Sequence, residues 1–103
     1  MDVTVLAIPD CPGVALLEDR LAAAAAGLPG IRVSHRVITG EAEAESAGMH
    51  GSPTLLVGGT DPFAVPGQSP GLACRLYPQD DGSLAVVPPV GELRRVLTEA
   101  EPE

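Results

Sequence analysis

Hydrophobic positions in the first part of the chain follow three different patterns, in three successive segments. Residues 3–8 (VTVLAI) are continuously apolar and rich in β-branched side chains, which is typical of a strand buried on both faces. Over residues 13–26 the apolar positions recur every three or four residues, and this spacing predicts an amphipathic helix that Gly27 ends. Residues 31–38 alternate between apolar and polar, which indicates a half-covered strand at or near a sheet edge. This order predicts two parallel strands joined by a right-handed crossover helix.

Similar patterns continue through the remainder of the chain. A short helix is predicted over residues 41–48, and a buried strand over residues 54–57. Residues 72–77 are predicted to form another strand, and residues 83–87 a short additional one. The last helix is expected over residues 90–100, where apolar side chains return at helical spacing.

The predicted order is strand–helix–strand–helix–strand–strand–helix. Strands and helices alternate at first, and a strand pair and a terminal helix follow. This order predicts an α/β fold with a mixed four-stranded sheet and helices on both faces. A chain of 103 residues is the size of one domain, here residues 1–103. The loop of residues 58–71 is unusually long for such a domain, and it is expected to cover the sheet edge or contact a partner.

Composition and charge exclude several classes of function. The formal net charge is −8, and an acidic surface repels phosphate backbones, so a nucleic-acid partner is not expected. No apolar run approaches the roughly 18 residues of a membrane span. No basic residue precedes the first apolar run, as one would in a signal peptide. We therefore expect a cytoplasmic protein without a membrane partner, in a compartment where thiols stay reduced.

Cys11, in the stretch IPDCPGVALL, is the first candidate for chemistry. It follows the first predicted strand and precedes the first predicted helix, at the sheet edge where open α/β folds bind ligands. The unpaired N–H groups and the positive end of a helix stabilise a thiolate. The neighbouring carboxylate of Asp10 opposes this effect. The alternative interpretation is that Cys11 is a small buried hydrophobe, as free cysteines usually are.

The motifs DCPGV and HGSPTLLVGG, in this order of elements, resemble those of the thioredoxin superfamily. The resemblance covers nearly the whole chain and implies a thioredoxin-like fold in which Cys11 is the catalytic thiol. It also implies that Pro53 is a cis-proline facing this thiol. The substrate-binding residues would then be Pro12, Ser52, Pro53 and Thr54, with Ser52 contributing its backbone. The alternative is an ordinary trans proline that opens a strand.

The sequence departs from the dithiol motif of this superfamily at Val14, which stands where a second cysteine is expected. Exchange through a dithiol requires a resolving thiol within reach of the mixed disulfide. The resemblance therefore implies a monothiol protein, whose partner is a thiol-containing small molecule or protein. Glutathione or mycothiol would serve as the low-molecular-weight co-substrate, and no metal or other cofactor is expected. The alternative is a non-catalytic thioredoxin-fold interaction module that makes its contacts through the 58–71 loop.

Cys74 is the candidate second thiol. In the thioredoxin arrangement its strand lies two places from the first, a lateral separation of roughly 10 Å. A disulfide requires Cα atoms within about 7 Å, so Cys74 is expected to be a buried strand residue instead. A weaker resemblance, to the thioredoxin-like region of alkylmercury lyase, implies a site for a soft metal or an organomercurial held by Cys11 and Cys74. Val14 stands where that enzyme has the proton-donating Asp, so cleavage of organomercurials is not implied.

The two histidines lead to different expectations. His35, on the apolar face of a predicted edge strand, is expected to be a packed residue rather than a catalytic base. His50 lies three residues before Pro53 and is a candidate to approach Cys11, where an imidazolium would favour the thiolate. The alternative for His50 is a solvated loop residue.

Overall fold

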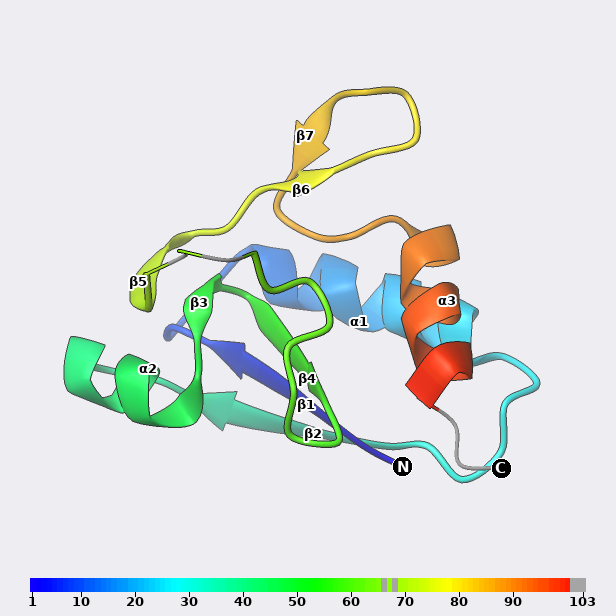
Figure 1. Ribbon diagram of the computed structural model, residues 1–103, viewed down its shortest axis with the longest axis horizontal. Coiled ribbons are helices and arrows are strands. Elements are labelled where there is room, and N and C mark those ends of the chain that lie inside the picture. Colours follow the sequence, from blue (N-terminus) through cyan, green and yellow to red (C-terminus); the bar gives the residue numbers. More distant parts are fainter. Residues whose placement is uncertain (66, 68, 101–103) are drawn as a thin grey trace.

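The structure is a computed structural model that describes residues 1–65, 67 and 69–100, apart from the side chain of Cys74. Its central element is a mixed sheet with the strand order β2-β1-β4 (Figure 1). Strand β1 (Asp2–Ala7) pairs in parallel with β2 (Arg32–Val37) and antiparallel with β4 (Thr54–Val57). The predicted parallel pair and its crossover helix are confirmed.

Helices cover both faces of this sheet, as predicted for an α/β fold. Helices α1 (Gly13–Ala25) and α3 (Val90–Ala100) pack against each other on one face, and α2 (Glu41–Ala47) lies against the other (Figure 1). Successive side chains of a strand point to opposite faces, so β1 contributes to two cores. The core under α1 and α3 contains Val3, Val5, Leu17, Leu21, Ala24, Leu55, Val57, Val87, Leu93 and Leu97. The core under α2 contains Leu6, Ile38, Ala44 and Met49.

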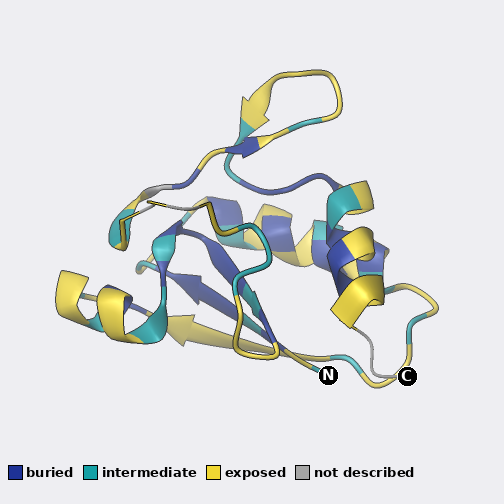
Figure 2. Ribbon diagram, viewed as in Figure 1, coloured by how far each residue is buried: buried dark blue, intermediate teal, exposed yellow. Residues whose placement is uncertain are grey.

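Strand β2 lies at the sheet edge, as its alternating pattern predicts. All six of its residues are exposed, including the apolar Val33 and Val37 (Figure 2). The strand is therefore more open than the half-covered strand expected from the sequence. The difference arises because α1 packs over β1 and β4 and leaves β2 uncovered. His35 of this strand is exposed as well, so the prediction that it is a packed residue is wrong.

The prediction of a fourth strand in the central sheet is wrong. Within the part of the chain that the structure describes, β5 (Gly71–Cys74) pairs in parallel with β3 (His50–Ser52). Strand β6 (Tyr77–Pro78) pairs antiparallel with β7 (Leu84–Ala85) in a separate hairpin. The single strand predicted over 72–77 is therefore divided, and neither part joins the central sheet. Strand β3, which leads directly into β4, was not predicted.

Arg75 follows β5 and Tyr77 begins β6, on either side of the break in the predicted strand. Both side chains are buried, whereas the apolar Leu76 between them is 57% exposed. The guanidinium of Arg75 turns inward to a carboxylate of the 58–71 loop, where Asp61 Oδ2 lies 2.6 Å from Nη1. Burial of an arginine requires such a partner, and an apolar pattern does not show where the partner is. The ion pair with Asp61 therefore lies where the chain passes from β5 to β6.

Candidate functional site

Cys11 lies between β1 and α1, at the N-terminal end of the helix. Its carbonyl accepts a hydrogen bond from the Val14 N–H at 3.2 Å, and Pro12 is the N-cap residue. Cys11 is a free, half-buried cysteine. It is therefore not enclosed in the apolar core, and the interpretation of Cys11 as a fully buried hydrophobe is wrong.

The hydroxyl of Ser52 is the closest polar group to the thiol. Ser52 Oγ donates to Cys11 Sγ at 3.0 Å and accepts from the Ile8 N–H at 3.1 Å. Ser52 is only 1% exposed, so these two protein groups account for its hydrogen bonds. The backbone donor occupies a lone pair of the oxygen and leaves the hydroxyl proton for the sulfur. A hydrogen bond to a charged acceptor is stronger than one to a neutral acceptor, so this contact stabilises the thiolate.

Pro53 lies beside the start of α1, and the peptide bond between Ser52 and Pro53 is cis, as the resemblance implied. A Cβ placed on Gly13 would lie 3.1 Å from Pro53 Cδ, so the first helical turn approaches the proline closely. The Tyr77 hydroxyl donates to the Pro53 carbonyl at 2.8 Å. Burial raises the pKa of the Tyr77 phenol, which keeps this group a donor. Pro53 thus lies against the first turn of α1, next in the chain to Ser52, which contacts Cys11.

The other predicted substrate-binding residues have different positions. Thr54 is fully buried, and its hydroxyl donates to the Gly51 carbonyl at 2.6 Å, so it supports the segment from within. The Ser52 carbonyl accepts from the Arg75 N–H at 3.2 Å and is occupied by the chain itself. The resemblance assigned the backbone of Ser52 to the substrate, whereas the structure turns its side chain to Cys11. Pro12 is exposed next to the thiol.

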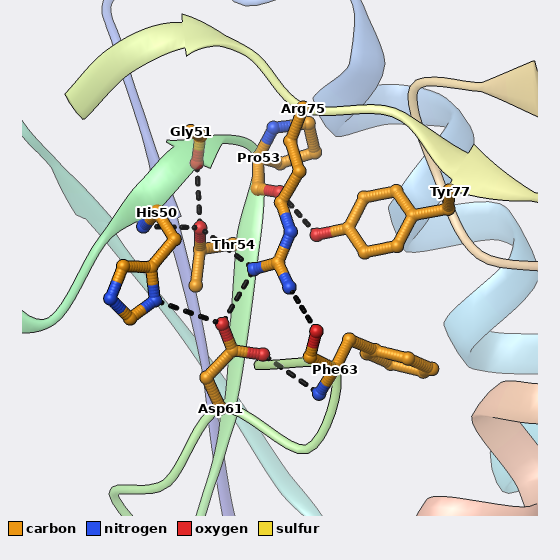
Figure 3. A network of polar contacts seen from close by, with 8 residues as sticks. All are labelled: His50, Gly51, Pro53, Thr54, Asp61, Phe63, Arg75 and Tyr77. Atoms are coloured by element: carbon orange, nitrogen blue, oxygen red, sulfur yellow. Dashed lines mark hydrogen bonds and ion pairs between the residues drawn. The ribbon is translucent and has the colours of Figure 1, made fainter. Parts of the chain in front are cut away.

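A buried polar network lies behind Pro53 and was missed in the sequence (Figure 3). Arg75 and Asp61 form its centre, with side chains 4% and 5% exposed. Arg75 also donates to the Phe63 carbonyl at 2.6 Å, and its guanidinium carbon lies 4.8 Å from the Tyr77 ring centroid. The available signal was one arginine in an otherwise apolar segment, LACRLY, and one aspartate in a Gly/Pro-rich loop.

His50 belongs to this network and not to the thiol site. Its Nδ1 lies 3.3 Å from Asp61 Oδ2, and the side chain is 24% exposed (Figure 3). The structure thus gives His50 a partner in the loop, and the expectation of a merely solvated histidine is wrong. The network joins Asp61 of the loop to His50 of β3 and to Arg75, the residue that follows β5.

A cavity of ≈ 370 Å³ opens beside Cys11, between α1 and β2. Polar groups stand at its margin: Asp10 beside the thiol, and Glu18 and His35 farther along, with His35 Nε2 2.9 Å from Glu18 Oε1. Most of the wall is apolar, so the cavity offers the thiol a hydrophobic neighbourhood. The apolar lining residues are Val5, Ala7, Ile8, Val14, Ala15 and Val37. We call this cavity the α1–β2 groove.

The side chain of Cys74 lies outside the described residues, but its backbone is described. Cys74 is the register partner of Ser52 in the parallel pairing of β3 and β5. Adjacent strands are about 4.8 Å apart, so the backbone of Cys74 lies one strand away from Ser52, whereas its predicted separation from the first strand stays a prediction.

Metal ligands and relatives give no further indication of function. Among the residues described here, no group of three or more His, Cys, Asp or Glu side chains is placed to hold a metal ion. None of the helices in these ranges is long and apolar enough to cross a membrane. Comparisons with protein-family models, with curated proteins and with solved structures give no match to the chain. A function must therefore be inferred from the geometry of the site.

Replacing Ser52 by alanine is expected to slow alkylation of Cys11 by iodoacetamide at pH 7. Loss of one hydrogen bond to a charged sulfur, about 1–1.5 kcal/mol, corresponds to a rate about five- to tenfold lower. The rate is measured by intact-protein mass spectrometry, after circular dichroism has shown that the variant is folded. Ser34→Ala removes an exposed hydroxyl of β2 and should leave the rate unchanged. A folded Ser52→Ala protein that alkylates like the wild type contradicts the assigned role.

Proposed function

We propose that this chain is a monothiol protein of the thioredoxin fold, in which Cys11 forms mixed disulfides by thiol–disulfide exchange. The observation that carries the proposal is the contact of 3.0 Å from Ser52 Oγ to the sulfur of the half-buried Cys11 at the start of α1. Two independent effects favour the thiolate there, the helix N-terminus and the hydroxyl. The order of β1, α1, β2, α2 and β4 around Pro53 is consistent with this fold.

The exchange needs no group beyond the thiolate and an external disulfide. The Cys11 thiolate attacks one sulfur of the disulfide, so a new S–S bond forms and the original S–S bond breaks. The departing thiolate takes a proton from water. Val14 supplies no resolving thiol, so the mixed disulfide persists until a low-molecular-weight thiol attacks it and restores Cys11. The Ser52 hydroxyl stabilises the Cys11 thiolate before the attack and again when Cys11 leaves.

The test follows formation of the mixed disulfide with bis(hydroxyethyl) disulfide by intact-protein mass spectrometry at pH 7. The wild type and Cys74→Ser are expected to gain one adduct at the same rate. Cys11→Ser should gain none on that time scale, because the nucleophile is missing. An unreactive Cys11 in the folded wild type would contradict the proposal and leave the non-catalytic interaction module. An adduct that forms equally fast in Cys11→Ser would contradict it as well.

A second candidate is a thiolate pair for a soft metal, formed by Cys11 and Cys74. The observation that favours it is the register of β3 and β5, which sets the backbone of Cys74 opposite Ser52. Soft thiolates select soft metals such as mercury(II). Titration with mercury(II), followed by the ultraviolet thiolate–metal absorption, should give one equivalent bound, and either cysteine variant should weaken it sharply. Binding that is unaffected by Cys74→Ser rules out the pair.

A further inference from the structure

We infer that the site acts on small, uncharged, largely apolar disulfides, which bind in the α1–β2 groove, and that it does not act on extended peptides. This inference rests on the proposed function, whose substrate class it narrows. Two separate features of the structure carry it. One is the occupied strand edge beside Pro53, and the other is the shape and charge of the groove.

The strand edge beside Pro53 is filled by the chain itself. A protein substrate would bind there by adding an extended segment to an open strand edge. Here β5 takes that place: the Gly71 N–H donates to the Met49 carbonyl at 3.1 Å, and the Arg75 N–H donates to the Ser52 carbonyl at 3.2 Å. The buried pair of Arg75 and Asp61 holds β5 in this position. Among the described residues, β5 therefore occupies the edge of β3 that an extended peptide would need at this side of the thiol.

The other side of Cys11 opens into the α1–β2 groove. Ligand pockets generally measure about 300–1,000 Å³, so a cavity of ≈ 370 Å³ suits a small molecule. Its wall is mainly apolar, which favours burial of hydrocarbon arms on either side of an S–S bond. The apolar part of the wall disfavours a charged arm, because a charge placed against it would lose its hydration without gaining a partner there.

The charges at the margin of the groove act against anionic disulfides. The carboxylates of Asp10 and Glu18 both line it, and the chain as a whole carries −8. The one guanidinium in the lining, Arg36, is paired with Glu43 at 3.5 Å. His35 is paired with Glu18. Glutathione disulfide, which carries a net negative charge, is therefore expected to be a poor substrate for this groove.

The experiment compares four disulfides on the full chain: diethyl disulfide, cystamine, dithiodipropionate, and a disulfide-linked decapeptide with uncharged side chains. Each rate of adduct formation at Cys11 is divided by the rate for the same chain unfolded in urea, which removes the intrinsic reactivity of the reagent. The ratio is expected to be largest for diethyl disulfide. It should be at least about tenfold lower for dithiodipropionate, because the carboxylates of the reagent and those that line the groove repel each other. The peptide is expected to give a lower ratio than diethyl disulfide, which is the other uncharged reagent.

Ala15→Phe tests the groove directly, since it places a bulky side chain on the lining of α1. We expect it to slow diethyl disulfide about tenfold and to leave alkylation by the smaller iodoacetamide within about twofold. Ala23→Phe makes the same change on an exposed position of α1 outside the groove and should alter neither rate.

The possible outcomes separate the two proposals. If an ionic disulfide or the peptide gives the largest ratio, or if Ala15→Phe reacts like Ala23→Phe, the groove is not the substrate site and the further inference is overturned. If Cys11 forms no adduct with any of the four reagents, although iodoacetamide alkylates it, the proposed exchange function itself fails.

Discussion

Replacing Arg75 by methionine is expected to lower the free energy of unfolding by about 3–5 kcal/mol, because removal of one member of a buried ion pair leaves the other charge uncompensated. Of its partners among the described residues, the carboxylate of Asp61, 5% exposed, would keep His50 and the Phe63 N–H. The Phe63 carbonyl would lose its donor as well. Domains are stable by only about 5–15 kcal/mol, so a change of this size is a large part of the total. Urea unfolding followed by far-ultraviolet circular dichroism measures it.

Arg95→Met is the matched control for this substitution. Arg95 also forms two ion pairs, with Glu92 and Glu99, but its side chain is 50% exposed. Exposed pairs contribute about 0–1 kcal/mol, so this variant should remain close to the wild type. Adding Asp61→Asn to Arg75→Met removes the uncompensated carboxylate and should recover part of the lost free energy of unfolding. If Arg75→Met and Arg95→Met are equally stable, the network does not hold the loop and β5 in place.

Those parts of the fold that depend on local pattern could be predicted from the sequence. Strand β4 and helix α3 have the predicted bounds, and α1 ends one residue before the predicted position, because apolar periodicity and a terminating glycine are local signals. The position of β5 depends on a different kind of contact. The partners Arg75 and Asp61 are 14 residues apart, and nothing in the spacing of apolar residues indicates that they meet.

The candidate site, like the fold, was predictable from the sequence only in part. The positions of Cys11 and Pro53 followed from motifs and from the order of elements, and the structure brings both to the start of α1. The role of Ser52 could not be predicted, because the direction of a hydroxyl depends on its surroundings. Here the Ile8 N–H of a distant segment fixes the oxygen and directs its proton to the sulfur.

Gly51→Ala is the second substitution for which a large effect is expected. Gly51 has φ +105°, a conformation that residues with a Cβ rarely adopt. A Cβ there would also lie 2.8 Å from Arg75 Cβ and 3.0 Å from the Ala73 carbonyl oxygen, both in or next to β5. Backbone strain of about 1–3 kcal/mol and overpacking of about 1–3 kcal/mol together predict that the free energy of unfolding falls by about 2–6 kcal/mol.

Gly82→Ala separates the two causes. Gly82 has φ +86°, but no atom lies within 4 Å of the point that a Cβ would occupy there, so the substitution adds backbone strain without overpacking. The difference between the two variants, measured by urea unfolding, therefore reports how closely β5 lies on β3. If the free energy of unfolding falls equally in the two variants, the close packing of β5 on β3 is contradicted.

The same pair of variants connects stability to substrate choice. A Cβ at Gly51 is expected to push β5 away from β3, because both short contacts are to the segment that carries the Arg75 N–H. The Ser52 carbonyl then loses its donor and offers an open strand edge to an extended peptide. Under conditions in which Gly51→Ala remains folded, its rate with the disulfide-linked decapeptide, relative to the unfolded chain, should rise about severalfold, whereas Gly82→Ala should match the wild type. An unchanged peptide rate in folded Gly51→Ala would mean that β5 is not what excludes peptides from Cys11.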